Sequence, residues 1–125
     1  MRVGVWTSFV EGDILHAFLW TREDGIRQLK PLQRRVPAHV DSEAYGINEA
    51  RQIVGVSCDA DFVDCRAVVW NNGTVPTDLN EFKGSYSAHL ESAKDINNKG
   101  EITGRAADPI TGVLTAYLAV PVGGH

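Results

Sequence analysis

Several features are missing from the 125-residue chain, and each absence narrows its possible functions. No apolar run approaches the roughly 20 residues of a membrane-spanning helix, so we predict no membrane span. Its 12 Lys and Arg against 16 Asp and Glu give a net charge of −4, which argues against a nucleic-acid partner. Residues 1–4 lack the apolar stretch of a signal peptide.

Helical periodicity and catalytic motifs are also missing. No window of a dozen residues has the apolar spacing of an amphipathic helix. The sequence contains neither a Gly-x-Ser-x-Gly nucleophile elbow nor a glycine-rich phosphate loop. We therefore assign no catalytic residue, no cofactor and no resident metal.

The chain does contain an internal repeat, and its length suits a single domain over residues 1–125. Repeat 1 spans about 13–57 and repeat 2 about 63–105, with a partial copy at each end. The clearest matches, at offsets of 49 and 50 residues, pair 44–55 with 93–104 and 16–20 with 66–70.

Each repeat is predicted to form four short strands, a to d, rich in Val, Ile, Phe and Trp. Asp-Gly at 24–25 and Asn-Gly at 72–73 mark the tight turn between strands a and b. The predicted strands in the two repeats are 14–20 and 65–70 (a), 26–30 and 74–79 (b), 44–48 and 93–97 (c), and 52–57 and 101–105 (d).

Four strands every 49 or so residues is the spacing of a propeller blade. The predicted fold class is therefore all-β, with tandem four-stranded antiparallel repeats in a β-propeller-like arrangement of about two and a half blades. A half blade exposes unpaired edges, so we expect a homo-oligomer, with a dimer sharing the blade across a two-fold axis favoured. The alternative is a β-sandwich-like body, closed within one chain by pairing of the terminal strands.

Residues 16–20, His-Ala-Phe-Leu-Trp, resemble the signature of the HAF repeat, a bacterial family described as extracellular. The similarity continues in the same order through 78–80, 93–97 and 100–104, and the chain departs from the pattern at Arg51, where the family has glycine. The family carries no established catalytic residues. The resemblance implies a repeat architecture and an extracellular or cell-surface location.

The loop 58–65 holds the densest group of candidate ligands. Cys58 and Cys65 flank a predicted hairpin tip at bridging distance, so we predict a structural disulfide, with two reduced thiols as the alternative. The aspartates at 59, 61 and 64 offer oxygen ligands for calcium, but their spacing lacks the glycine and the distal glutamate of an EF-hand loop. We favour a solvated acidic tip over a calcium site or a zinc site at the two cysteines.

Other candidates recur in both repeats, which indicates structural roles, because catalysis needs one asymmetric constellation. His39 and His89 match in this way. Trp20 and Trp70 also share a repeat position, which favours packing in the core or between blades over a sugar-stacking platform. His16, which is not repeated, is typical of a polar strand face.

Arg51 stands where the second repeat has Gly100, just before strand d. A turn of this length often needs a positive φ there, which favours glycine. We therefore predict that Arg51 has a positive φ.

These observations predict a non-catalytic β-repeat scaffold or binding module that acts at the cell exterior on a protein or glycan ligand. The alternative is a propeller-type hydrolase or lyase with a calcium-assisted site. Such an enzyme requires titratable residues that are unique to one repeat and converge in a pocket.

Overall fold

The structure is a computed structural model. It describes the backbone of residues 3–11, 14–34 and 37–121, and the side chains of 14–34 and 37–121. The described chain forms ten strands and one short 3-10 helix. In chain order they are β1 (Val3–Glu11), β2 (Ile14–Thr21), β3 (Gly25–Leu29), β4 (His39–Ile47), β5 (Gln52–Asp59), β6 (Cys65–Asn71), β7 (Pro76–Asp78), η1 (Leu79–Phe82), β8 (His89–Ile96), β9 (Ile102–Ala107) and β10 (Leu114–Ala119).

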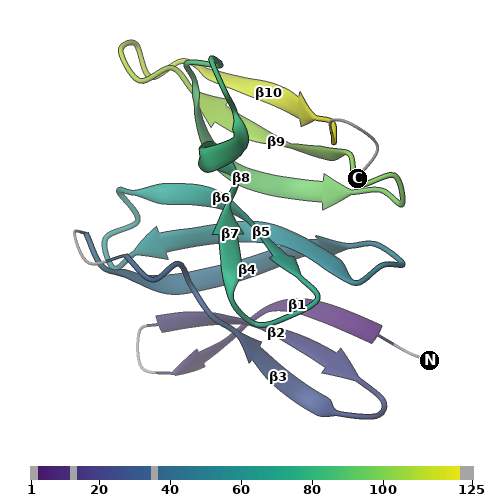
Figure 1. Ribbon diagram of the computed structural model, residues 1–125. Coiled ribbons are helices and arrows are strands. Elements are labelled where there is room, and N and C mark those ends of the chain that lie inside the picture. Colours follow the sequence, from purple (N-terminus) through teal and green to yellow (C-terminus); the bar gives the residue numbers. More distant parts are fainter. Residues whose placement is uncertain (1–2, 12–13, 35–36, 122–125) are drawn as a thin grey trace.

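The strands form three antiparallel sheets, ordered β1-β2-β3, β4-β5-β6-β7 and β10-β9-β8. The sheets lie one above another in chain order, with the first sheet at the bottom of Figure 1 and the third at the top. We call them the first, second and third sheets. The predicted all-β class is confirmed, and none of the three described sheets closes into a barrel.

The division into sheets differs from the prediction. Ten strands equal two and a half blades in number, but the second sheet combines strands c and d of repeat 1 with strands a and b of repeat 2. Strands β1 and β10 each join a three-stranded sheet, so the described strands contain no half blade. The sandwich-like alternative is also wrong, because β1 and β10 lie in different outer sheets.

Connection lengths explain this division. The c-to-d, d-to-a and a-to-b connections of the second sheet are short, and short hairpin loops keep consecutive strands in one sheet. The b-to-c connections, at 30–38 and 79–88, are longer and carry the chain to the next sheet. The sheet boundary therefore falls between b and c.

Strand c is also longer than predicted, since β4 begins at His39 and β8 at His89. The added segment of β4 is polar, and for that reason its sequence does not indicate a buried strand. Its side chains are nevertheless satisfied by the first sheet: Asp41 Oδ1 accepts from Leu15 N at 2.8 Å, and Ser42 Oγ accepts from Ala17 N at 3.1 Å.

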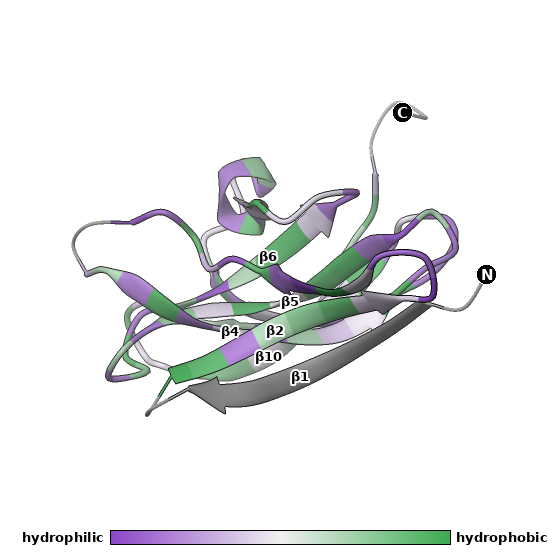
Figure 2. Ribbon diagram, turned by 90° about the horizontal axis from the view of Figure 1, so that it is seen from below, coloured by the Kyte–Doolittle hydropathy of each residue, from purple (hydrophilic) through white to green (hydrophobic). Residues whose placement is uncertain are grey.

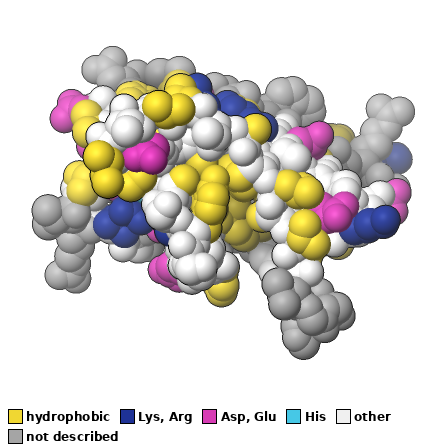
Figure 3. All heavy atoms as spheres, turned by 90° about the horizontal axis from the view of Figure 1, so that it is seen from above, with side chains coloured by type: hydrophobic (Ala, Val, Ile, Leu, Met, Phe, Trp, Pro, Cys, Tyr) yellow, Lys and Arg dark blue, Asp and Glu magenta, His cyan; other side chains and the backbone are white. Residues whose placement is uncertain are grey.

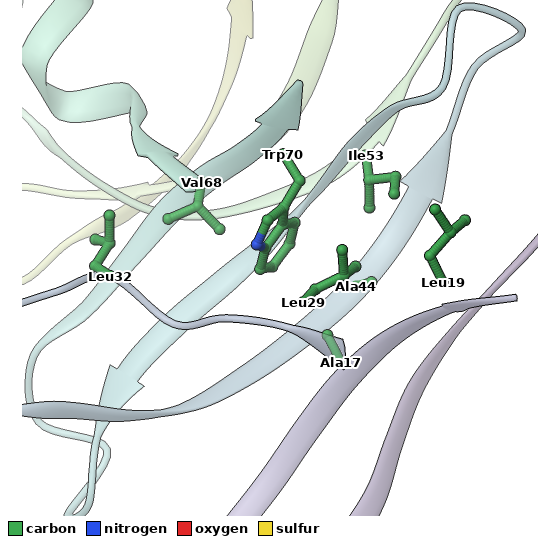
Figure 4. Close-up of a cluster of buried hydrophobic side chains, with 8 residues drawn as sticks. All are labelled: Ala17, Leu19, Leu29, Leu32, Ala44, Ile53, Val68 and Trp70. Atoms are coloured by element: carbon green, nitrogen blue, oxygen red, sulfur yellow. The ribbon is translucent and has the colours of Figure 1, made fainter. Parts of the chain in front are cut away.

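Two apolar cores hold the stack together, one on each face of the second sheet. Figure 2 shows apolar residues following strands such as β2 and β6, with polar residues gathered in the connecting loops. The lower core, between the first and second sheets, appears in Figure 4; it contains Ala17, Leu19, Leu29, Leu32, Ala44, Ile53, Val68 and Trp70. The upper core, between the second and third sheets, contains Val54, Ala67, Leu90, Ala93, Ile96, Ile102 and Ala106.

The second sheet is buried on both faces. Successive residues in a strand point to opposite faces, so Ile53 enters the lower core and Val54 the upper core. In the same way Trp70 points down and Ala67 points up. Burial on both sides explains why β5 lacks the apolar and polar alternation of a half-exposed strand.

A glycine contact recurs in two of the sheets. A Cβ atom added at Gly55 would overlap the carbonyl oxygen of Glu43, and one at Gly104 would overlap that of Ser92. Both pairs are 49 residues apart, and both face a register shift in the neighbouring strand c. The glycine that ends each Ile-x-Gly motif is therefore required by the close approach of strand c.

The positive φ predicted at Arg51 is confirmed. Arg51 has a φ of 61° and Gly100 a φ of 79°. A residue with a Cβ atom is strained in this left-handed region, whereas glycine is not.

Replacing Arg51 by glycine is expected to raise the free energy of unfolding by up to about 1 kcal/mol. Relief of the left-handed strain, about 1–2 kcal/mol, is offset in part by the greater unfolded-state entropy of glycine, about 0.4–1 kcal/mol. Urea denaturation measures the change. Gly100→Ala, the reverse change at the equivalent turn, should destabilise, and an Arg51→Gly midpoint clearly below wild type at an equal m-value would contradict the strain argument.

Candidate functional site

The β5–β6 hairpin tip carries the predicted cysteine pair. Cys58 and Cys65 are directly opposite each other in the ladder, with Cα atoms 4.2 Å apart, and a disulfide joins them. Asp59 Oδ1 closes the loop by accepting from Val63 N at 2.8 Å and Asp64 N at 3.1 Å. The tip is therefore held by one covalent bond and by local hydrogen bonds.

Thiol titration of the denatured, unreduced protein is expected to find no reactive thiol. Reduction should lower the free energy of unfolding by about 2.5 kcal/mol, because the disulfide closes an eight-residue loop in the unfolded chain. Urea denaturation with and without reductant measures this loss. Two reactive thiols in the unreduced protein would contradict the disulfide.

The three aspartates of the tip do not converge. Asp59 caps the loop, Asp64 points to His39 and Arg66, and Asp61 is exposed. Among residues 14–34 and 37–121, no group of three or more His, Cys, Asp or Glu side chains is arranged to hold a metal ion. The calcium-assisted site has no support in this geometry.

His39 instead joins Ser57 to Asp64, which sequence reasoning missed. Its Nδ1 lies 2.7 Å from Ser57 Oγ, and its Nε2 lies 2.7 Å from Asp64 Oδ2. Serine, histidine and aspartate are the residue types of a nucleophile, its base and the group that orients the base. The matching positions of the second repeat hold Ala106 and Val113, so this network occurs in one repeat only.

Burial prevents this network from acting as a nucleophilic site. The side chain of His39 and the whole of Ser57 are 0% exposed, and Ser57 Oγ also accepts from Leu32 N at 2.9 Å. Neither the small cavity of about 30 Å³ beside Arg51 nor the open depression described below includes these residues. The asymmetry that an enzyme requires is present, but the described residues bury the Ser57 hydroxyl and the His39 imidazole completely, so we assign the network a structural role.

Positive groups surround Asp64. Arg66 Nε lies 3.3 Å from its Oδ2 and Arg34 Nε lies 3.7 Å away, while Arg66 Nη1 also pairs with Asp78 at 2.9 Å. Burial opposes ionisation of Asp64, but its bond to His39 and the charge of Arg66 outweigh burial and lower the pKa of this carboxyl.

Asp64→Asn is expected to lower the free energy of unfolding by about 2 kcal/mol at pH 7, the scale of hydrogen bonds to a charged group. A lowered pKa contributes stability that is present above the ordinary value near 3.9 and is lost as the pH falls through the folded value. The difference from wild type should therefore shrink below about pH 4. Urea titrations from pH 7 to pH 3 test this, with the exposed Asp61→Asn as control; a difference of unchanged size at pH 3 contradicts it.

The other sequence candidates are dispersed. His89 Nε2 donates to Cys65 O at 2.7 Å, and His16 Nδ1 lies 2.9 Å from Gln28 Nε2. Trp70 is fully buried in the lower core, whereas Trp20 is half-buried on the lower side of the first sheet. These residues form no shared site.

An open depression of about 710 Å³ lies beside the c-to-d turns of the second and third sheets, at the right-hand hairpin ends in Figure 1. Matching residues of the two repeats stack there: Asn48 Nδ2 donates to Asn97 O at 3.0 Å, and Glu49 N donates to Asn98 Oδ1 at 2.8 Å. The lining residues are Ile47, Asn48, Glu49, Arg51, Ile96, Asn97 and Asn98.

Some groups in this depression remain available to a ligand. Within the described part of the chain, no hydrogen bond or ion pair engages the side chains of Glu49 and Arg51, or the Nδ2 of Asn98. The amides of Asn48 and Asn97 are instead occupied within the turns. The depression thus combines donors, acceptors and two isoleucines on a fixed wall.

No family model, curated protein or solved structure matches this chain. The resemblance to the HAF repeat accordingly stays a prediction. No helix among the described residues is long and apolar enough to cross a membrane.

Proposed function

We propose that this chain is a non-catalytic, propeller-like binding module of the HAF-repeat type that acts at the cell exterior and holds a glycan in the open depression. The observation that carries the proposal is the lining of the depression, where Glu49, Arg51 and Asn98 keep free polar groups between Ile47 and Ile96. A sugar presents hydroxyl donors and acceptors together with apolar C–H faces, so a mixed lining of this kind suits it.

Further observations support parts of this proposal. Face-to-face stacking of consecutive sheets is the contact that propeller blades make, and it favours the propeller-like interpretation. The disulfide favours an oxidising location, because such bonds persist mainly outside the reducing cytosol. Burial of Ser57 and His39 supports binding over nucleophilic catalysis.

The test is binding of the protein to an array of bacterial surface glycans, followed by titration of the best ligand. Glu49→Gln and Arg51→Gly should each weaken binding about tenfold, the effect of one lost charged contact. Arg51→Gly is informative because it should remove the guanidinium without lowering stability. The matched control is Glu23→Gln, an exposed acid in the β2–β3 turn. The proposal fails if wild type binds no glycan, or if both variants bind as tightly as wild type.

A further inference from the structure

We propose that the upper face of the third sheet docks on the lower face of the first sheet of a second copy, so that two chains associate head to tail. Upper and lower refer to the orientation of Figure 1. This inference concerns surfaces away from the depression and does not depend on the glycan proposal.

The β10 edge of the third sheet's upper face is apolar and uncovered by described residues, while Thr103 and Arg105 of β9 share that face as the cross-strand partners of Leu118 and Ala116. Tyr117 and Ala119 of β10 pack against the upper core, so the alternate residues Ala116 and Leu118 point the other way. Leu118 is 63% exposed, and the apolar side chains of Leu114 and Val120 are also exposed. Figure 3, which views the molecule from above, shows hydrophobic side chains gathered on this face.

Equivalent positions in the other two sheets are covered by the next sheet. Ala17 and Leu19 of the first sheet lie in the lower core, under the second sheet. Ala67 of the second sheet lies in the upper core, and Val69 packs against that core, under the third sheet. Leu118 corresponds to Leu19 and Val69 in the repeat, so the β10 edge has the chemistry of a covered position, whereas Thr103 and Arg105 of β9 stand where β5 has Val54 and Val56.

The lower face of the first sheet provides the matching surface. Trp20 occupies the repeat position of Trp70, which fills the lower core from above. Trp20 is half-buried, and its cross-strand partner Ile26 is 64% exposed. Contact between Leu118 of one copy and Trp20 of another would reproduce the packing of Leu19 and Trp70 in the lower core.

Repeat equivalence therefore selects a second copy as the occupant, with the upper face of one copy on the lower face of the other. A head-to-tail contact either closes into a ring or continues as a filament. Two copies place six sheets in one ring, within the range of four to eight that propellers adopt. This arrangement replaces the shared half blade, because β1 and β10 already belong to three-stranded sheets.

Sedimentation equilibrium at about 100 μM tests this arrangement. Wild type should have twice the 13.7 kDa chain mass, whereas Leu118→Asp and Ile26→Asp alone should each be monomeric. A 1:1 mixture of these two variants should restore a dimer, because each retains the face that the other lacks. Val75→Asp is the matched control: Val75 is 62% exposed but lies in the β6–β7 connection, and this variant should remain dimeric.

Two results would overturn the proposal. One is a monomeric wild type at this concentration. The other is an Ile26→Asp variant that still dimerises while Leu118→Asp does not, since that pattern means that two upper faces meet across a two-fold axis. Glycan binding by the Leu118→Asp monomer, measured separately, shows whether the ligand site functions without association.

Discussion

Replacing Trp70 by alanine is expected to lower the free energy of unfolding by about 4 kcal/mol, within the range for large aromatic truncations in a core. Trp70 is fully buried in the lower core, where it contacts residues of the first and second sheets (Figure 4). Its Nε1 also donates to Lys30 O at 2.9 Å, across the boundary between these sheets. The variant therefore loses packing and leaves a carbonyl oxygen without its partner.

The matched control for Trp70 is the other tryptophan of the repeat. Trp20→Ala removes the same atoms from a half-buried position, so its loss should be about 1–2 kcal/mol. Both changes should be made in the Leu118→Asp background, which removes any contribution from association. Thermal or urea unfolding provides the measurement. Equal losses at the two positions would contradict the assignment of Trp70 to an inter-sheet core and of Trp20 to an outer face.

Gly55→Ala is expected to destabilise the protein by about 3 kcal/mol, at the upper end of the range for overpacking. The new methyl group would overlap the carbonyl oxygen of Glu43, which is backbone and cannot turn aside like a side chain. Strand β4 must then separate from β5, and that movement disturbs the lower core through Ala44. Gly104→Ala should have a comparable effect, because its Cβ would overlap the carbonyl oxygen of Ser92.

Gly73→Ala is the control for both glycine variants. It has no atom within 4 Å of an added Cβ and its φ is not in the left-handed region, so its stability should stay within about 0.5 kcal/mol of wild type. Urea midpoints for the three variants give the comparison. A Gly55→Ala midpoint equal to that of Gly73→Ala would mean that the two strands are not as close as described.

Much of the fold follows from the repeat. Strand alternation, turn dipeptides and the offset of 49 to 50 residues were sufficient to predict ten antiparallel strands and the positive φ of Arg51. Sheet membership was harder to predict, because a four-stranded sheet can begin with strand a of a repeat or with strand c, and the strand sequences are the same in both cases. The sheet boundary is set by the long connection after strand b, which carries the chain to the next sheet. The sequence shows the length of this connection but not that it leads to another sheet.

The polar network was beyond the reach of sequence patterns. His39, Ser57 and Asp64 are separated by 18 and 7 residues along the chain and meet only because β4, β5 and the hairpin tip are neighbours. The recurrence of His39 as His89 indicated a strand position, but their partners differ. The extension of strand c to these histidines was missed for a similar reason. Its first residues are polar and make hydrogen bonds to a neighbouring sheet, so the sequence there lacks the apolar alternation that predicts a strand.

The depression was also not predictable from the sequence. Its residues occupy the c-to-d turns, which in the sequence are typical of solvated loops. Stacking of one turn on the next brings Asn48 to Asn97 and Glu49 to Asn98, and this juxtaposition creates the wall. The offset of 49 residues between the two turns was the one signal in the sequence that could have predicted their contact, because equivalent turns of stacked sheets lie side by side.

The central claim is that equivalent positions of the repeat make equivalent contacts, within one chain and between two. Its most direct test is cysteine cross-linking of a mixture of Leu118→Cys and Trp20→Cys proteins under mild oxidation. A non-reducing gel should show a covalent product of twice the 13.7 kDa chain mass in the mixture, and essentially none from either variant alone. Cross-linking of Leu118→Cys with itself, or no product in the mixture, would contradict the head-to-tail repeat.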